Sequence, residues 1–174
     1  MPSLKRLIQL LYEKKPAPPP PSRRRGRKKP QLFNMKTIVK NQTDFIDRLD
    51  SFGVNAWNEK FDYLVELSDL LPSVCPGELY PYRVAACQSR TYFTARIEGG
   101  RLRVDGWSNT PVQRGIIVSV IEMFDRTPAA ELTDSRDVFF HEKSGLVNNL
   151  TPLRKEGLKE MVNRIRVLCR ETEE

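Results

Sequence analysis

The spacing of hydrophobic positions changes partway along the chain from a helical period to a strand period. Between residues 42 and 72 apolar side chains return every three or four positions, which predicts two helices, one ending at Gly53 and one closed by Pro72. From residue 91 apolar and polar positions alternate, which predicts a half-buried strand. One side of that strand carries Thr91, Phe93, Ala95 and Ile97, and the other carries Arg90, Tyr92, Thr94 and Arg96.

A second strand is predicted directly after the first. Gly99 and Gly100 indicate a tight turn, because glycine reaches the left-handed backbone conformation that a two-residue hairpin turn requires. Leu102 and Val104 then alternate with charged residues. The two segments should therefore pair as an antiparallel hairpin.

Three Thr-Pro pairs follow, at residues 110–111, 127–128 and 151–152. Each pair fits the start of a helix, with a capping hydroxyl and then a proline where the missing N–H is no loss. After the first pair, Gln113 stands where a capping box would place it. The third pair precedes a long apolar stripe that includes Cys169. We therefore predict an α+β fold in which a small antiparallel β-sheet packs against helices.

Charge divides the chain into two parts. The whole sequence of 174 residues has a net charge of +7, but residues 1–34 hold ten basic residues and one acidic residue, so that residues 35–174 have a net charge of −2. With 39% hydrophobic residues the chain can bury one ordinary core. We expect residues 1–34 to be a disordered, basic, Pro-rich extension and residues 35–174 to be a single folded domain.

The basic extension leaves alternatives open. It could bind nucleic acid or an acidic membrane surface, and its short amphipathic start is similar to an organelle-targeting peptide. It could also be dispensable, with Met35 as an alternative first residue. The net acidic body argues against a nucleic-acid-binding module. No apolar run approaches the roughly 20 residues that a membrane span needs, so we expect a soluble protein.

The candidate chemistry centres on Cys87. The chain has three cysteines and one histidine, with no CxxC pair and no closely spaced metal ligands. Their number and spacing, without a secretory signal, favour a reducing compartment, here the cytoplasm. Cys169 is interpreted as a core residue and Cys75 as a loop thiol. Cys87 stands where a loop meets a strand, between Arg83 and Arg90, and positive neighbours lower the pKa of a thiol.

Several roles of Cys87 can be weighed against one another. A free cysteine is often an inert buried side chain. A cysteine hydrolase needs a base beside its nucleophile, and His141 is predicted to lie on a helix face instead. A lone reactive thiol can still exchange sulfur, because attack on a sulfur atom needs neither metal nor base.

Four segments together resemble the SufE family of sulfur acceptors, also called cysteine desulfuration proteins. They are "WNEKFDYLVELSDLLP", "ACQS", "GWSNTPVQRGIIVSVI" and "LTPLRKEGLKEMVNRIR", in the family's order over about residues 45 to 169. The resemblance implies a fold similar to that of iron–sulfur scaffold proteins. It also implies that Cys87 accepts sulfur from the persulfide of a cysteine desulfurase, stimulating that enzyme, and passes it to an iron–sulfur scaffold. Arg154 matches the family's basic residue in "LTPLR".

The resemblance also implies what the protein lacks. It would be a carrier and not an enzyme, with no cofactor of its own, because the pyridoxal phosphate (PLP) belongs to a SufS-like desulfurase. The scaffold partner would be SufBCD-like, and the chain a monomer or a weak dimer. We expect Arg154, Arg83 and Arg90 to stabilise the Cys87 thiolate, and the resting loop to tuck Cys87 against apolar side chains. A rival hypothesis makes Cys87 a nucleophile that turns over without a partner.

Three positions depart from the family pattern. Ala86 stands where the family usually has glycine before the cysteine, which would hinder a left-handed backbone there. Tyr92 replaces a usual tryptophan. Asn109 replaces a common acidic residue, which leaves any acidic contact from that turn in doubt.

Overall fold

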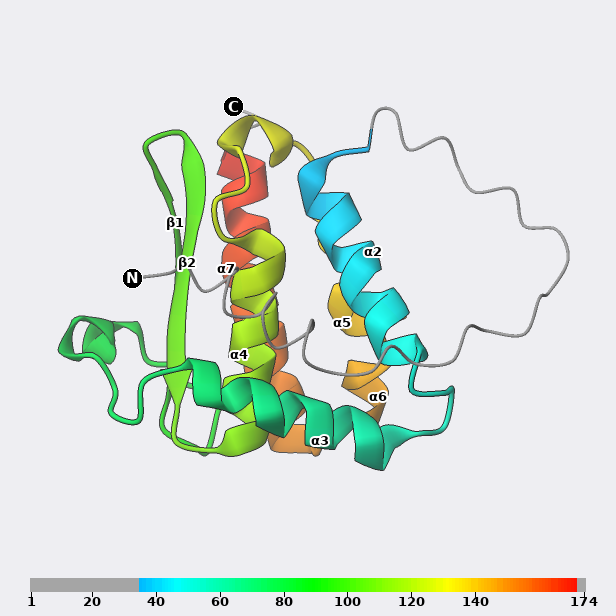
Figure 1. Ribbon diagram of the computed structural model, residues 1–174. Coiled ribbons are helices and arrows are strands. Elements are labelled where there is room, and N and C mark those ends of the chain that lie inside the picture. The colour runs from blue at the N-terminus through cyan, green and yellow to red at the C-terminus, as the bar shows by residue number, and fades with distance from the viewer. Residues whose placement is uncertain (1–34, 172–174) are drawn as a thin grey trace, which may run out of the picture.

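The computed structural model describes residues 35–171 (Figure 1). The extension predicted for residues 1–34 lies outside the described residues. In the described part, helices pack against one two-stranded antiparallel sheet, which confirms the α+β fold class. No helix there combines the length and the apolar character that crossing a membrane would require.

Helix α4 (Pro111–Phe124) is the centre of the molecule, and most of its residues are buried. It contacts α2 (Thr37–Asp50), α3 (Trp57–Leu67) and strand β2 (Arg101–Ser108). Helix α7 (Pro152–Glu171) packs against strand β1 (Thr91–Glu98). In Figure 1 the hairpin lies on one side of α4 and α2 on the other, while α3 crosses one end. The core therefore forms around α4.

Short elements connect these parts. They are the 3₁₀ helices Ser68–Leu70, Gly77–Tyr82, Ala129–Glu131 and Ser135–Asp137, and the one-turn helices α5 (Phe140–Lys143) and α6 (Leu146–Asn149). Helices α3 and α4 cross in backbone contact, because a Cβ atom on Gly115 would lie 1.8 Å from the carbonyl oxygen of Leu64. Glycine is therefore required at that crossing.

The hairpin has the predicted turn. Glu98 pairs with Arg101, and Gly99 and Gly100 have φ of 56° and 71°, as a two-residue hairpin turn requires. The predicted alternation of burial is wrong at two positions. Thr94 is buried, on a strand that contacts both α7 and the 3₁₀ helix Gly77–Tyr82, and Ile97 near the turn is exposed.

Three helix starts differ from their predictions. Helix α2 begins at Thr37, before its strongest apolar positions. The pair Thr127-Pro128 opens only a short 3₁₀ turn, because the backbone of Thr127 and Ala129 bonds to the start of β2 instead (Leu102 N–H to Thr127 O, 2.8 Å; Ala129 N–H to Gly100 O, 2.9 Å). Helix α4 has no side-chain cap, and the predicted capping box is absent because Gln113 is fully buried.

Candidate functional site

Cys87 lies in a short loop, residues 85–90, that we call the thiol loop. Its base is closed by a backbone hydrogen bond from Val84 N–H to the Thr91 carbonyl (2.9 Å), and a turn inside it is closed by Cys87 N–H bonding to the Val84 carbonyl (3.2 Å). Ala86 has no left-handed backbone, because Arg126 is the only non-glycine residue with positive φ in residues 35–171. The alanine in place of the family's glycine is therefore accommodated without strain.

Arg83 holds the backbone of the thiol loop. Its guanidinium group donates to the carbonyls of Ser89 (2.6 Å), Thr91 (3.2 Å) and Cys87 (3.4 Å). It also lies over the ring of Tyr92, 5.7 Å from the ring centre. Because its N–H groups are directed at these carbonyls, Arg83 shapes the loop.

Two further contacts anchor the ends of the loop. Glu160 of α7 accepts the backbone N–H of Ala86 (2.9 Å) and is paired with Arg164 (2.5 Å), which itself donates to the carbonyl of Arg83 (2.7 Å). At the other end Asn109 and Arg90 exchange hydrogen bonds: Arg90 N–H to Asn109 Oδ1 (3.0 Å) and Asn109 N–H to Arg90 O (3.1 Å). Asn109 thus holds the loop at the position where the family often has an acid.

The side chain of Cys87 turns inward although the loop is at the surface. Ala85, Gln88 and Arg90 are exposed, whereas Cys87 is 5% exposed. Its sulfur rests on the backbone of α7 at Gly157, because a Cβ atom on that glycine would lie 2.0 Å from Sγ. From α4, Nε2 of Gln113 comes within 3.9 Å of the same sulfur. The expected tucked position of Cys87 is thus formed by two helices as well as by apolar neighbours.

The pKa of the Cys87 thiol is raised, and the expectation of a lowered pKa is wrong for this conformation. Burial is the main cause and the charge of Glu160 adds to it, while a hydrogen bond with Thr91 and the charge of Arg83 oppose it. Arg83 is therefore the one predicted arginine that favours the thiolate. Arg90 acts electrostatically on Cys75 instead. Cys87 is buried, whereas Arg90 is exposed.

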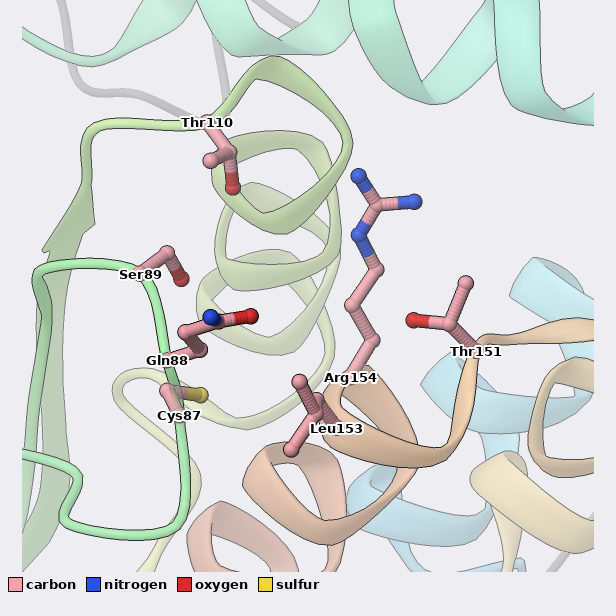
Figure 2. A pocket seen from close by; sticks show the side chains of 7 residues that line it. All are labelled: Cys87, Gln88, Ser89, Thr110, Thr151, Leu153 and Arg154. Atoms are coloured by element: carbon pink, nitrogen blue, oxygen red, sulfur yellow. The ribbon is translucent and has the colours of Figure 1, made fainter.

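A pocket of about 190 Å³ opens beside Cys87. Its lining comes from the thiol loop, the turn before α4 and the beginning of α7: Cys87, Gln88, Ser89, Thr110, Thr151, Leu153 and Arg154. Figure 2 shows Arg154 reaching to the Thr110 end of the pocket, away from the sulfur. Arg154 therefore shares the pocket with Cys87 without being among the charges that act on its thiol.

The remaining candidate residues lie elsewhere. Cys75 is partly exposed and Cys169 is fully buried in the core, and none of the three cysteines forms a disulfide within residues 35–171. His141 is buried on α5 beside Glu142 and does not line the pocket, as its predicted place on a helix face implied. Within residues 35–171 no cluster of His, Cys, Asp or Glu is arranged to hold a metal ion.

Sequence reasoning missed Gly157 and Glu160 and assigned Gln113 a different role. Gly157 carried a signal, because glycine in the middle of a helix costs about 1 kcal/mol relative to alanine and suggests a close contact. Gln113 carried one too, as a polar side chain on an apolar helix. Neither signal names the partner, which comes from another part of the chain.

Comparison with known proteins identifies relatives. The sequence profile of the SufE family, described as an Fe-S metabolism associated domain, matches residues 44–169. An uncharacterized SufE-like protein of Rhizobium etli is 30% identical over 124 residues, covering 67% of this chain and 82% of that protein. The solution structure of a hypothetical protein from Thermus thermophilus has a similar fold, with a TM-score of 0.58 and 22% identity, covering 75% of this chain and 94% of the other. The chain belongs to the SufE family, whose domain is associated with iron–sulfur metabolism.

Proposed function

We propose that the protein is a sulfur acceptor and carrier for iron–sulfur cluster assembly, with Cys87 as the atom that takes up sulfur. The observation that carries this proposal is the placing of a single thiol in a surface loop, inward at rest and at the edge of a pocket. Cys169 of α7, by contrast, is fully buried in the core and does not line this pocket.

The transfer is an exchange between sulfur atoms. The Cys87 thiolate attacks the outer sulfur of a partner's cysteine persulfide, a new S–S bond forms, the partner's S–S bond breaks, and the partner's cysteine leaves as a thiolate. Cys87 then carries S–SH, and no electrons are gained or lost overall. In the second transfer, an acceptor thiolate attacks the outer sulfur of the Cys87 persulfide, and Cys87 is released as a thiolate. Removal of the persulfide frees the donor enzyme for another cycle, which is how the carrier stimulates it.

Burial fits the resting stage of this cycle. A buried thiol with a raised pKa is mostly protonated, and a protonated thiol resists oxidation. For transfer the thiol loop must turn outward, where the solvated thiol has a lower pKa. Glu160 and Asn109 can hold the ends of the loop during this movement, whereas the hydrogen bonds that Arg83 donates to the carbonyls of Cys87 and Ser89 must break.

The proposed partners are a PLP-dependent, SufS-like cysteine desulfurase as donor and a SufBCD-like scaffold as acceptor. In this proposal the carrier binds no cofactor, works in the cytoplasm as a monomer or weak dimer, and needs only residues 35–174. Arg154 would assist at the pocket, where its guanidinium group has no hydrogen bond or ion pair to any other residue in 35–171 and is available to a partner's acidic group.

The test is sulfur uptake measured by mass. After incubation with a desulfurase and cysteine, the wild-type protein should gain one sulfur atom that a reducing agent removes. Cys87→Ser should gain none, and Cys75→Ser, which removes the partly exposed thiol, should behave as wild type. A gain that persists in Cys87→Ser would refute the assignment, and turnover without any partner would favour the independent nucleophile.

A further inference from the structure

Gln113 is a buried amide with too few partners. It lies in the first turn of α4 and is fully buried. Its Oε1 has no hydrogen-bond partner within residues 35–171, and its Nε2 is 3.9 Å from Sγ of Cys87. Buried polar groups are nearly always paired, so an amide in this state needs an explanation. Ser119, a second buried polar residue of α4, has an ordinary one, because its hydroxyl donates to the Gly115 carbonyl (3.0 Å).

The position of the amide supplies the explanation. Gly157 of α7 and Gln113 of α4 meet at the Cys87 sulfur: a Cβ atom on Gly157 would lie 2.0 Å from Sγ and 3.8 Å from Nε2 of Gln113. The amide therefore borders the place where the sulfur rests. No other side chain of α4 is bonded to Cys87 in the described part of the chain.

A side-chain amide can form a hydrogen bond with a cysteine sulfur in both of its protonation states. Its NH₂ group can donate to a thiolate, and its oxygen can accept from a thiol S–H. A half-turn about the last side-chain bond exchanges the positions of the oxygen and the nitrogen and leaves the rest of the side chain in place. The charged groups that face the thiol, Glu160 and Arg83, and Arg154 in the pocket cannot adapt in this way, because a carboxylate only accepts hydrogen bonds and a guanidinium group only donates them.

We propose that Gln113 is a positioning residue for the Cys87 sulfur, whose amide donates to the thiolate and, after a half-turn, accepts from the thiol, so that the sulfur stays seated on Gly157 in either state. The functional role of this contact rests on the proposed function, but the contact between Gln113 and Cys87 is a property of the isolated protein. It can therefore be tested without any sulfur transfer.

The experiment measures how fast Cys87 is alkylated over a range of pH, with the modified residue assigned by peptide mass. Gln113→Met keeps the length of the side chain and removes both polar atoms. The midpoint of the pH profile should move upward, with the thiolate fraction at neutral pH falling about fivefold, as loss of a weak hydrogen bond to a charged group predicts. The melting temperature should stay the same or rise, because an unpaired buried amide is removed.

Ser119→Ala is the matched control, because it removes another buried polar group from α4 and should leave the midpoint unchanged. Gln113→Leu replaces the methionine variant if that fails to fold. A midpoint equal to that of wild type in a folded variant overturns the proposal, whatever the sulfur uptake. A shifted midpoint supports it even if Cys87 accepts no sulfur, so the two proposals fail separately.

A measurement on the wild-type protein needs no variant of Gln113. The side-chain amide resonances of Gln113 should shift with the same pH midpoint as Cys87 alkylation, and should lose this shift in Cys87→Ser. Amide resonances that do not respond to pH near that midpoint would overturn the proposal.

Discussion

At the residue scale, Gly157 matters because of the side chain it lacks. The thiol of Cys87 occupies the space that a Cβ atom would need, so the closed position of the thiol loop depends on one hydrogen atom in place of a methyl group. Within a helix the glycine itself is unfavourable. Helix α7 is thus locally less stable at the position where it contacts Sγ of Cys87.

Gly157→Ala should therefore release the thiol. The methyl group cannot share its space with Sγ, while alanine favours the helix by about 1 kcal/mol. We expect Cys87 to be alkylated at least about tenfold faster at neutral pH, since a bias of about 1.4 kcal/mol toward the open loop suffices for that factor, with little loss of thermal stability. Glu156→Ala, at an exposed site of the same turn, is the control and should change neither property. Equal rates of Cys87 alkylation in Gly157→Ala and wild type would contradict the role given to Gly157.

At the element scale, one face of α7 organises the loop. Gly157, Glu160 and Arg164 follow one another at helical spacing, and in that order they seat the sulfur, bond Ala86 N–H, and bond the carbonyls of Arg83 and Phe93. Burial opposes ionisation of Glu160, but its hydrogen bonds with Ala86 and Arg164 prevail and lower its pKa. Glu160 therefore stays charged at neutral pH, next to the thiol whose pKa it raises.

Glu160→Gln should lower the pKa of Cys87. The substitution keeps an oxygen that can accept from Ala86 N–H but removes the negative charge that disfavours the thiolate. The pH midpoint of Cys87 alkylation should fall, which is the opposite direction from Gln113→Met. Glu156→Gln serves as the control, because Glu156 pairs with Lys159 on the exposed side of the same helix. A midpoint that rises or stays constant in Glu160→Gln would show that this charge does not act on the thiol.

At the scale of the whole molecule, a partly buried ion pair joins the helices that surround the core. Arg48 of α2 forms two hydrogen bonds of 2.8 Å with Glu122 of α4 and one of 3.2 Å with the hydroxyl of Tyr63 in α3. Both charged side chains are 18% exposed. Burial alone would lower the pKa of Arg48, but its bonds with Glu122 and Tyr63 raise it overall. The arginine is thus charged at neutral pH.

Arg48→Met should cost about 2 kcal/mol in the free energy of unfolding, because Glu122 is left partly buried without its partner. Urea unfolding measures this. Lys40→Met breaks an exposed pair with Asp44 and should cost at most about 0.5 kcal/mol. A loss in Arg48→Met no larger than in Lys40→Met would mean that the α2–α4 pair contributes little to stability. Neither residue lies at the thiol loop, so sulfur uptake should be unchanged in both.

The elements themselves could be predicted because they depend on neighbours in sequence. The helical spacing between residues 57 and 67, the alternation after residue 91 and the two glycines of the turn are local patterns, and the structure confirms each of them. Local patterns misled at Gln113 and Thr127. There the competing partners, the Cys87 sulfur and the first residues of β2, come from other parts of the chain.

What the sequence determined by itself is thus the order of helices and hairpin, the choice of Cys87 as the candidate thiol, and the resemblance that the family comparison bears out. Only the tertiary structure decided that this thiol faces inward, that Gly157, Gln113 and Glu160 surround it, and that its pKa is raised. The physical reason is that a pKa depends on burial and on charges within a few ångströms. For Cys87 these come from α4 and α7, which only folding brings to the loop.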